Sequence, residues 1–562
     1  MNITLNKMVR SRNLILILII SSSYLRFIIY GGFGSGDDLV FVKQSLNNPD
    51  FTDWLNGWLF SEMSARPVSS FFLILTHYLF KDNSSLYIFS GIIIWLLSVL
   101  TMSIILKNYF DNSSVYIFFL LGSFPFFSTS IFLNPYLFTQ YIIPILFWSL
   151  SLLCLLNHKN GKNLIYYFSG WFLLILSLLT LSYVLPLLLI TAFLPIIDNN
   201  NQNEMFNKDS LLVLILKYTI PVLIISLLFF FFKVYLVKIY VPQYNYYGLA
   251  PINIKSLLQS LYFYLAILIE VPIMLFQVIP HMINWNVFIT TIFIIVFLIV
   301  LKNRSIPESK IISNGKLLIG LVVISLLSSS SIFFISHYPS STFGFYNRMM
   351  LPSFILYSVL ISFSFGKLLH TRWFIFPIAI SILWVSSVIV QLDNSIKSWE
   401  IREYIMNDIS LKLNNENLQD EPLLIANMPY FLNSNYNNEE VTFCTWSFDT
   451  HLQFFGTHDI FTWPVCHRIV MDKSFYPNHN ILNNLSTISD DANIWYYEYE
   501  EGNRNGILYK LKNKQALLEK FEEIKIERIN YHPIILREKI RIAFKNLPMV
   551  RNIIKRHLPI DI

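Results

Sequence analysis

Charged residues are scarce in this 562-residue sequence, making up 14% of it, whereas soluble domains carry about 25%. Glycine is also scarce, with 17 residues, so we do not expect helices that pack mainly through small-residue GxxxG seams. The sequence has no P-loop, HExxH, GxSxG or CxxC pattern, which removes the usual motif evidence for nucleotide, zinc-protease, serine-hydrolase and dithiol chemistry. It also lacks a basic patch with interleaved aromatics, so we expect no nucleic-acid partner.

Long apolar runs are abundant. The composition is 54% hydrophobic and the mean hydropathy is +0.52, and a helix needs about 20 apolar residues to cross a bilayer. We therefore predict an all-α polytopic membrane domain with about 11 to 13 transmembrane helices, leaving the count between residues 197 and 285 open. The candidate segments are 13–30, 67–80, 84–106, 114–133, 135–157, 163–180, 181–197, 211–236, 256–280, 285–301, 314–336, 349–369 and 373–392.

The charges divide the chain into two parts. Residues 1–392 hold 22 Lys and Arg against 12 Asp and Glu, while residues 393–562 hold 19 against 23. Basic loops mark the cytoplasmic side of a membrane protein. Five basic stretches are therefore expected on the cytoplasmic side: the N-terminus, Lys107, 158–162, 302–310 and 366–372. This arrangement predicts that loop 31–67, the stretch 337–348 and the tail lie on the outer side.

The tail, residues 393–562, changes to short apolar runs broken by Asn, Asp, Pro and Gly, which is typical of a small α/β or α+β domain. Its last segment, 534–559, is basic and amphipathic, and either lies on an anionic lipid surface or packs on its own domain. Cys444 and Cys466 either form a disulfide or are two unrelated thiols. The frequent Lys, Asn and Ile favour a bacterial inner membrane, with this domain periplasmic or extracellular.

Acidic residues concentrate in the first outer loop, where five of the twelve in the membrane part occur within residues 31–67. Asp37 and Asp38 follow directly on the first apolar run. Asp37 is suited to cap the helix predicted after it, but a carboxylate at a lipid boundary is costly and is often functional. Both roles are compatible, because neighbouring side chains point in different directions.

Three short motifs occur in a characteristic order: GDD at 36–38, SARPVSSFFLILTHYLF at 64–80 and YNRMMLP at 346–352. In this order they resemble the GT-C fold glycosyltransferases that use polyprenyl-phosphate sugars. The closest resemblance is to the group of protein O-mannosyltransferases and aminoarabinose transferases, and to bacterial surface-glycan glucosyltransferases. The resemblance implies a polyprenyl-phosphate-linked sugar donor, membrane lipids around the enzyme, and a glycan, lipid or protein acceptor.

The resemblance also implies roles for individual residues. Asp37 takes the position of the catalytic carboxylate and Asp38 that of the second acid; a carboxylate can accept the proton of an attacking hydroxyl in an inverting displacement. The leaving phosphate needs cationic donors. The candidate donors are Arg348, His337, Arg66 and Lys43. As alternatives to phosphate binding, Arg348 could be a snorkelling residue at the membrane interface and His337 could make a structural hydrogen bond.

The sequence departs from the family pattern in its second outer loop, residues 128–141. This loop lacks an acidic residue, and its polar candidates are Asn134, Tyr136 and Gln140. No cofactor is implied with certainty, and use of a divalent cation stays open. Glu270 is the one acid inside an apolar segment and is a further candidate. A flippase, transporter or polymerase of lipid-linked glycans is the alternative function, although transporters usually place ionisable groups at the membrane midplane.

Overall fold

The computed structural model describes most of the membrane part and portions of the tail. The described residues are 2–33, 50–53, 55, 66–133, 138–161, 163–197, 208–236, 254–303, 313–335, 345–415, 423–427, 461–465, 494–499, 506–517 and 519. The two cysteines proposed to pair, Cys444 and Cys466, and the basic segment 534–559 lie outside these residues.

The chain divides into two compact units. The first consists of residues 1–31 and 48–392, and the second of residues 32–47 and 393–562. Helix α20 (Ile375–Asn415) contributes its residues up to 392 to the first unit and the remainder to the second.

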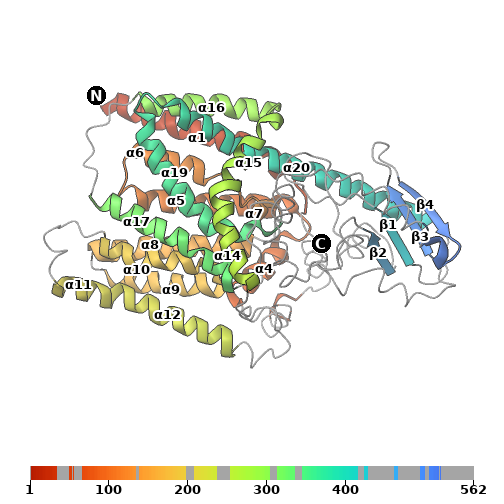
Figure 1. Ribbon diagram of the computed structural model, residues 1–562, viewed down its shortest axis with the longest axis horizontal. Helices are drawn as coiled ribbons and strands as arrows, with labels where there is room; N and C mark the ends of the chain where they lie inside the picture. The colour runs from red at the N-terminus through yellow and green to blue at the C-terminus, as the bar shows by residue number, and fades with distance from the viewer. Residues whose placement is uncertain are drawn as a thin grey trace, which may run out of the picture. The chain divides into compact units, whose positions relative to one another are not determined.

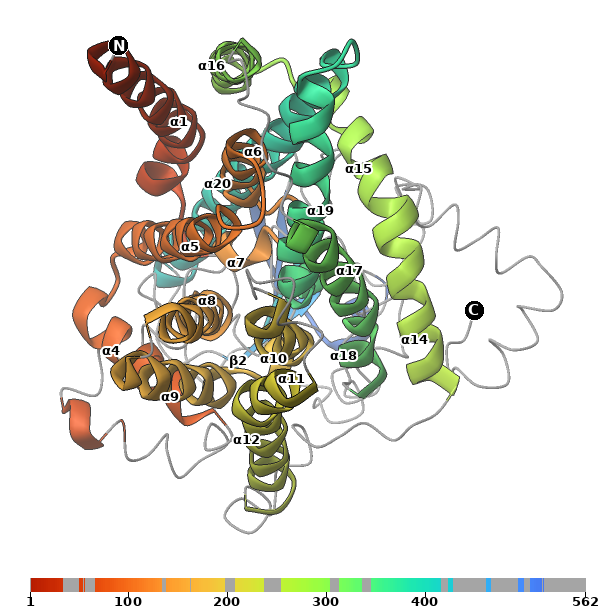
Figure 2. The ribbon, with the colours of Figure 1, turned by 90° about the vertical axis from the view of Figure 1, so that its left-hand side faces the viewer.

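The first unit is helical (Figures 1 and 2). Nine helices within the described residues are long and apolar enough to cross a membrane, and four apolar helices are shorter. They correspond one to one with the thirteen apolar segments of the sequence. Several of these spans join more than one helical element. Besides α20, the α-helices of this unit in the described residues are α1 (Asn2–Tyr30), α4 (Pro67–Phe80), α5 (Ser84–Leu106), α6 (Asn112–Gly122), α7 (Ser130–Leu133), α8 (Phe138–Gly161), α9 (Leu164–Thr180), α10 (Leu188–Ile197), α11 (Lys208–Leu214), α12 (Ile220–Phe231), α14 (Ile254–Leu265), α15 (Val271–Gln277), α16 (Trp285–Lys302), α17 (Ser313–Ser328), α18 (Ser330–Ile335) and α19 (Leu351–Leu369).

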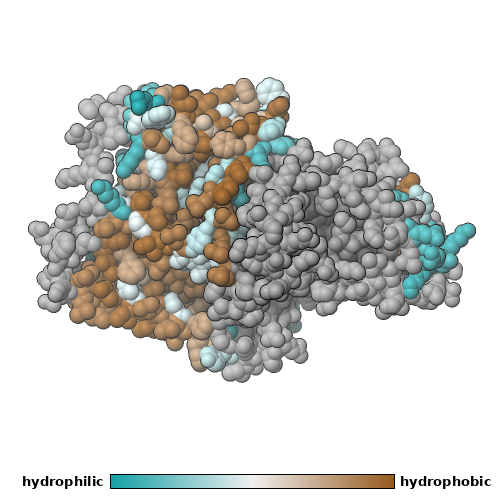
Figure 3. Space-filling view, viewed as in Figure 1, coloured by the Kyte–Doolittle hydropathy of each residue, from teal (hydrophilic) through white to brown (hydrophobic). Residues whose placement is uncertain are grey.

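Apolar side chains cover the outside of this unit as well as its interior. Figure 3 shows them over much of its visible face. Leu227 on α12 is 69% exposed, and Leu268, between α14 and α15, is 72% exposed. Such a surface would be unfavourable in water and is the surface expected in contact with lipid. The chain is a multi-pass membrane protein.

Helix α8 organises the packing. It lies against α9 and α5, and these three helices run close together when viewed nearly end on in Figure 2. Pro144 lies inside α8; because proline has no N–H, the helical hydrogen bond to the Gln140 carbonyl is missing. The carbonyl of Pro144 itself accepts a bond of 2.8 Å from the Ser177 hydroxyl of α9. Near its start, α8 therefore combines irregular backbone with polar partners.

The segment expected to be one helix over 114–133 is broken. Helix α6 ends at Gly122 and α7 begins at Ser130, so residues 123–129 are not helical although they are buried. Unpaired backbone groups away from water are costly, and here side chains from other helices bind the carbonyls. Trp95 Nε1 donates to Gly122 O at 3.1 Å.

Three more side chains donate hydrogen bonds to backbone carbonyls in or beside this break. Tyr24 donates to the Ser123 carbonyl at 2.6 Å, and Gln391 Nε2 donates to the Phe126 carbonyl at 2.7 Å. Trp384 Nε1 donates to the Leu121 and Phe124 carbonyls at 3.1 and 2.7 Å. Donors from α1, α5 and α20 therefore add to the backbone hydrogen bonds within the break and help to stabilise it.

Two apolar segments contain π-helical turns that precede a proline. The turn η4 (Ile215–Thr219) precedes Pro221, and η6 (Ala266–Glu270) precedes Pro272. In both turns the N–H after the turn bonds to the carbonyl five residues earlier. A proline ring would clash with the carbonyl four residues before it, and the wider turn accommodates this. A third π turn, η5 (Phe232–Leu236), follows α12.

The second unit contains a four-stranded mixed sheet in the order β2-β1-β3-β4. Strands β1 (Leu423–Asn427) and β2 (Phe461–Val465) are parallel, as are β1 and β3 (Ile494–Tyr499), whereas β3 and β4 (Gly506–Leu511) are antiparallel. The smaller domain with mixed helix and strand content expected from the sequence is confirmed.

The C-terminal part of α20 packs on this sheet. Its buried residues Ile405, Met406, Ile409 and Leu413 form a hydrophobic cluster with Leu424, Trp495 and Tyr497 of the strands. Asp408 on the same helix accepts hydrogen bonds from Lys412 Nζ at 2.5 Å, Tyr497 Oη at 2.8 Å and the Gly506 N–H at 3.0 Å. One carboxylate therefore joins the helix to both β3 and β4.

Residues 32 and 33 also belong to the second unit and contact α20. A Cβ added at Gly32 would lie 1.9 Å from the Trp399 ring, so only glycine fits this approach. Phe33 packs edge-on against Trp399, and Arg402 Nη1 donates to the Phe33 carbonyl at 2.9 Å. The two residues that lead into the acidic segment GDD are thus fixed to α20.

A candidate anion-binding site on helix α8

Arg66 lies immediately before α4, whose first residue is Pro67. A residue that precedes proline is disfavoured in the helical conformation, and Arg66 accordingly has φ −140° and ψ 57°. Its carbonyl accepts bonds from the Ser70 N–H and hydroxyl at 2.9 and 3.0 Å. The side chain is buried, with 7% exposed, and Nη1 donates to Gln140 Oε1 at 3.3 Å.

Arg348 lies in a 3-10 turn, η8 (Phe345–Met350), that runs directly into α19. Pro352 near the start of α19 suits a helix N-terminus, where its missing N–H has no helical partner to lose. The Arg348 side chain is 5% exposed, and the carbon of its guanidinium lies 5.3 Å from the centre of the Tyr141 ring. This is a cation–π contact.

The two arginines therefore reach consecutive residues of α8. Arg66 contacts Gln140 and Arg348 contacts Tyr141, although the arginines are far apart in sequence. Tyr141 is fixed from its other side, because the Tyr183 hydroxyl donates to its carbonyl and the two rings lie 5.5 Å apart. Tyr183 belongs to the 3-10 turn η3 (Ser182–Leu187).

Lys233 is a further cation, which the sequence analysis missed. It lies two residues beyond the apolar span Leu211–Phe231, and its Nζ donates to the Ser182 hydroxyl at 2.7 Å, next to Tyr183. A lysine placed within the run FFFFKVYLVK was the available signal, because cations in apolar segments are often functional.

The structure places the other candidates as follows. Gln140, a polar candidate of the second outer loop, accepts from Arg66. Glu270 ends the π turn η6 and accepts a hydrogen bond from the Tyr262 hydroxyl. The remaining candidates lie outside the described residues: Asp37, Asp38, Lys43, Asn134, Tyr136 and His337.

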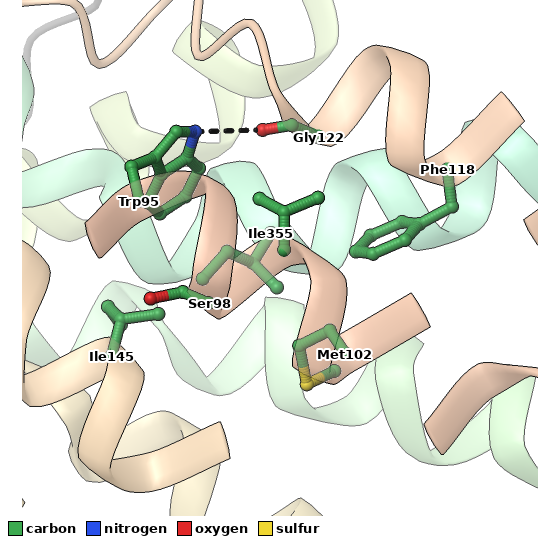
Figure 4. Close-up of a pocket in the computed structure, with 8 residues that line it drawn as sticks. Trp95, Ser98, Met102, Phe118, Gly122, Ile145 and Ile355 are labelled. Atoms are coloured by element: carbon green, nitrogen blue, oxygen red, sulfur yellow. Dashed lines mark hydrogen bonds between the residues drawn. The ribbon is translucent and has the colours of Figure 1, made fainter. Parts of the chain in front are cut away.

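No metal cluster accompanies these contacts in the described part of the chain. No group of three or more His, Cys, Asp or Glu residues there could hold a metal ion. A small pocket between α5, α6, α8 and α19 is lined mainly by apolar side chains such as Met102, Phe118, Ile145 and Ile355 (Figure 4). Ser98 also lines it but bonds to Ile94 O of its own helix at 2.9 Å. This pocket lacks charged groups and is separate in character from the cationic cluster.

The chemistry of the cluster follows from its charge. Arg66 and Arg348 are cations at buried positions. Their guanidinium groups supply planar, forked donors suited to carboxylate or phosphate oxygens. We call the set Arg66, Gln140, Tyr141 and Arg348 the α8 cationic cluster.

Comparison with known proteins gives one structural similarity. No model of a known protein family matches the chain, and no curated protein matches its sequence. The crystal structure of ArnT from Cupriavidus metallidurans in the apo state is similar over 89% of this chain and 98% of that chain. The TM-score is 0.37 and the sequence identity 11%. ArnT is a GT-C aminoarabinose transferase, a member of the group that the sequence motifs resemble. At this TM-score and identity, the similarity assigns no role to any residue here.

Proposed function

We propose that the chain is an inverting membrane glycosyltransferase that moves a sugar from a polyprenyl-phosphate donor to a lipid-linked glycan, a lipid or a protein. One observation supports this most strongly: two buried guanidinium groups, of Arg66 and Arg348, contact the side chains of consecutive residues of α8 in a unit with an apolar surface. A polyprenyl phosphate carries a long apolar chain and a charged phosphate. Its recognition therefore requires cations that can be reached from lipid.

In this proposal the α8 cationic cluster binds the phosphate of the donor. As the bond between the anomeric carbon and the phosphate oxygen breaks, its electron pair stays on the phosphate. The guanidinium groups of Arg66 and Arg348 stabilise that developing charge, and fixed donors are most effective where charge develops. The ring of Tyr141 holds the Arg348 guanidinium in place, and Gln140 holds that of Arg66.

The first loop supplies the base. We assign Asp37 to accept the proton of the acceptor hydroxyl as its oxygen attacks the anomeric carbon, with Asp38 as the second acid. A single displacement inverts the configuration at that carbon. His337 and Lys43 are further candidate contacts of the phosphate.

The proposed location is the inner membrane of a bacterium, with loop 31–67, the stretch 337–348 and the tail on the outer face. The distribution of basic loops supports this orientation. Alkaline phosphatase fused after residue 562 tests it, because that enzyme is active only outside the cytoplasm. An active fusion is expected, and an inactive fusion with normal expression contradicts the orientation.

The function is tested with the purified full chain in proteoliposomes that contain lipid extracts rich in polyprenyl-phosphate sugars. Mass spectrometry should show release of polyprenyl monophosphate by the wild type. Asp37→Asn should abolish release, because the amide keeps the size of the side chain but cannot accept a proton. Asp82→Asn, in the exposed turn before α5, is the matched control and should retain activity. Near-normal release by Asp37→Asn contradicts the catalytic assignment.

A further inference from the structure

Two residues of α20 hold the chain where it enters the second unit. Trp399 and Arg402 are three residues apart, so they are neighbours on one face of the helix. Arg402 Nη1 donates to the Phe33 carbonyl at 2.9 Å, and its guanidinium carbon lies 5.8 Å from the centre of the Trp399 ring. The Phe33 ring packs edge-on against Trp399, with 6.1 Å between the ring centres. Both the backbone and the side chain of Phe33 therefore contact α20.

These contacts are buried and close. Arg402 is 2% exposed and Phe33 is 4% exposed. A hydrogen bond from a charged donor is stronger than one from a neutral donor. At Gly32 the backbone approaches Trp399 so closely that an added Cβ would lie 1.9 Å from its ring. The chain at Gly32 and Phe33 therefore cannot shift on α20 without losing a buried bond or colliding with the ring.

The proposed base follows this anchor closely in sequence. Asp37 comes four residues after Phe33, so their Cα atoms are at most about 14 Å apart. Gly34 and Gly36 lie between them, and glycine restrains the backbone less than any other residue. The region that Asp37 can occupy is therefore set by where Phe33 is held.

A base needs more accurate placement than a phosphate-binding group elsewhere in the chain can provide. The carboxylate must come within about 2.6–3.2 Å of the acceptor hydroxyl, and a displacement of about 1 Å can slow a reaction by up to about 100-fold. In the proposed function, binding of the donor phosphate depends on Arg66 and Arg348 instead. A change at the anchor should therefore affect turnover and donor binding differently.

We propose, on the basis of the proposed function, that Trp399 and Arg402 are positioning residues that place Asp37 for proton transfer. They act through Gly32 and Phe33 rather than on the substrate. Both residues belong with Asp37 to the second unit. Helix α20 thus has a role in catalysis besides its packing on the sheet.

The rate of polyprenyl monophosphate release by the full chain in proteoliposomes tests this, measured against the amount of lipid extract. Arg402→Met should lower the maximal rate by roughly 10- to 100-fold, whereas the amount of extract that gives half the maximal rate should not change. Arg402→Lys keeps a charged donor and should recover part of the rate. Trp399→Leu should show the same separation with a smaller loss, because the bond from Arg402 remains.

Lys412→Met is the matched control on the same helix. Lys412 Nζ lies 2.5 Å from both Asp408 Oδ2 and the Gly506 carbonyl, so it stabilises the packing of α20 on the sheet and does not contact the anchor. This variant should have a lower melting temperature and an unchanged maximal rate. The amplitude of the thermal unfolding transition reports the folded fraction of each variant.

The outcomes separate this inference from the proposed function. If the wild type releases polyprenyl monophosphate but Arg402→Met keeps the wild-type maximal rate, or needs more extract in proportion to its loss of rate, the inference alone is wrong. An equal loss of rate in Lys412→Met also refutes it, because instability of the unit would then be the cause. If Arg402→Met does not fold, a wild-type rate in Trp399→Leu refutes the inference. If the wild type releases none, both proposals fail.

Discussion

Replacing Arg348 by methionine should weaken binding of polyprenyl monophosphate more than it harms folding. The side chain is buried, and its guanidinium is directed over the Tyr141 ring. A hydrogen bond from a charged group contributes about 1.5–3 kcal/mol, which corresponds to a loss of roughly 10- to 150-fold in affinity. Methionine keeps most of the volume, so cavity formation contributes little.

Arg348→Lys separates charge from geometry. Its ammonium can still lie over the Tyr141 ring, and a cation–π contact contributes about 0.5–2 kcal/mol. Lysine loses the planar fork that binds two phosphate oxygens together. We therefore expect an affinity between those of the wild type and Arg348→Met.

Isothermal titration of protein in nanodiscs with polyprenyl monophosphate measures these affinities. Arg372→Met is the matched control, because Arg372 also lies near an aromatic ring, 5.4 Å from the centre of Trp373, but is exposed. It should bind like the wild type. If Arg348→Met bound as tightly as this control, Arg348 would not contact the phosphate and the reasoning would be refuted.

Two further predictions concern the two units separately. Asp408→Asn should weaken three charge-assisted hydrogen bonds and lower the free energy of opening of the sheet by about 1–3 kcal/mol. Amide hydrogen exchange in β3 and β4 should become faster. The exposed control Glu403→Gln should leave exchange unchanged, and unchanged exchange in Asp408→Asn would contradict the prediction. Trp384→Phe should remove the indole donor from the Leu121 and Phe124 carbonyls, which keep their backbone hydrogen bonds. The loss should cost about 0.5–1.5 kcal/mol, seen as a lower melting temperature than that of the exposed control Trp373→Phe; equal melting temperatures would be inconsistent with this account.

The helical part of the fold was predictable because its signal is local. Each apolar segment is long enough to be recognised from its own residues, and each corresponds to a helix of the structure. The tail runs EPLLIAN and GILYKL likewise contain β1 and β4. The order of the sheet was not predictable, because pairing between β1, β2 and β3 depends on residues far apart in sequence.

The break at 123–129 illustrates what local reasoning misses. The residues there are apolar enough for a continuous helix, and the expectation over 114–133 followed from that. The break is stabilised by Tyr24, Trp95, Trp384 and Gln391, whose positions are set by three other helices. Only the folded chain shows that these donors meet the carbonyls.

The candidate site was partly predictable. Arg66 and Arg348 were identified from short motifs, but no pattern in the sequence shows that both side chains contact α8. Gln140 was identified as a polar residue of a loop rather than as the acceptor of Arg66. Lys233 was overlooked because it occurs in a run of phenylalanines that reads as part of an apolar helix. Its hydrogen bond to Ser182, which is distant in sequence, is visible only in the folded chain.

The central claim is that the α8 cationic cluster binds the phosphate of a polyprenyl lipid, and a structure of the full chain with polyprenyl monophosphate bound tests it most directly. We expect phosphate oxygens within 2.7–3.2 Å of nitrogen atoms of both Arg66 and Arg348, the usual range for such hydrogen bonds. The polyprenyl chain should lie along the apolar surface of the first unit. A phosphate bound elsewhere, with both guanidinium groups out of contact, would contradict the account.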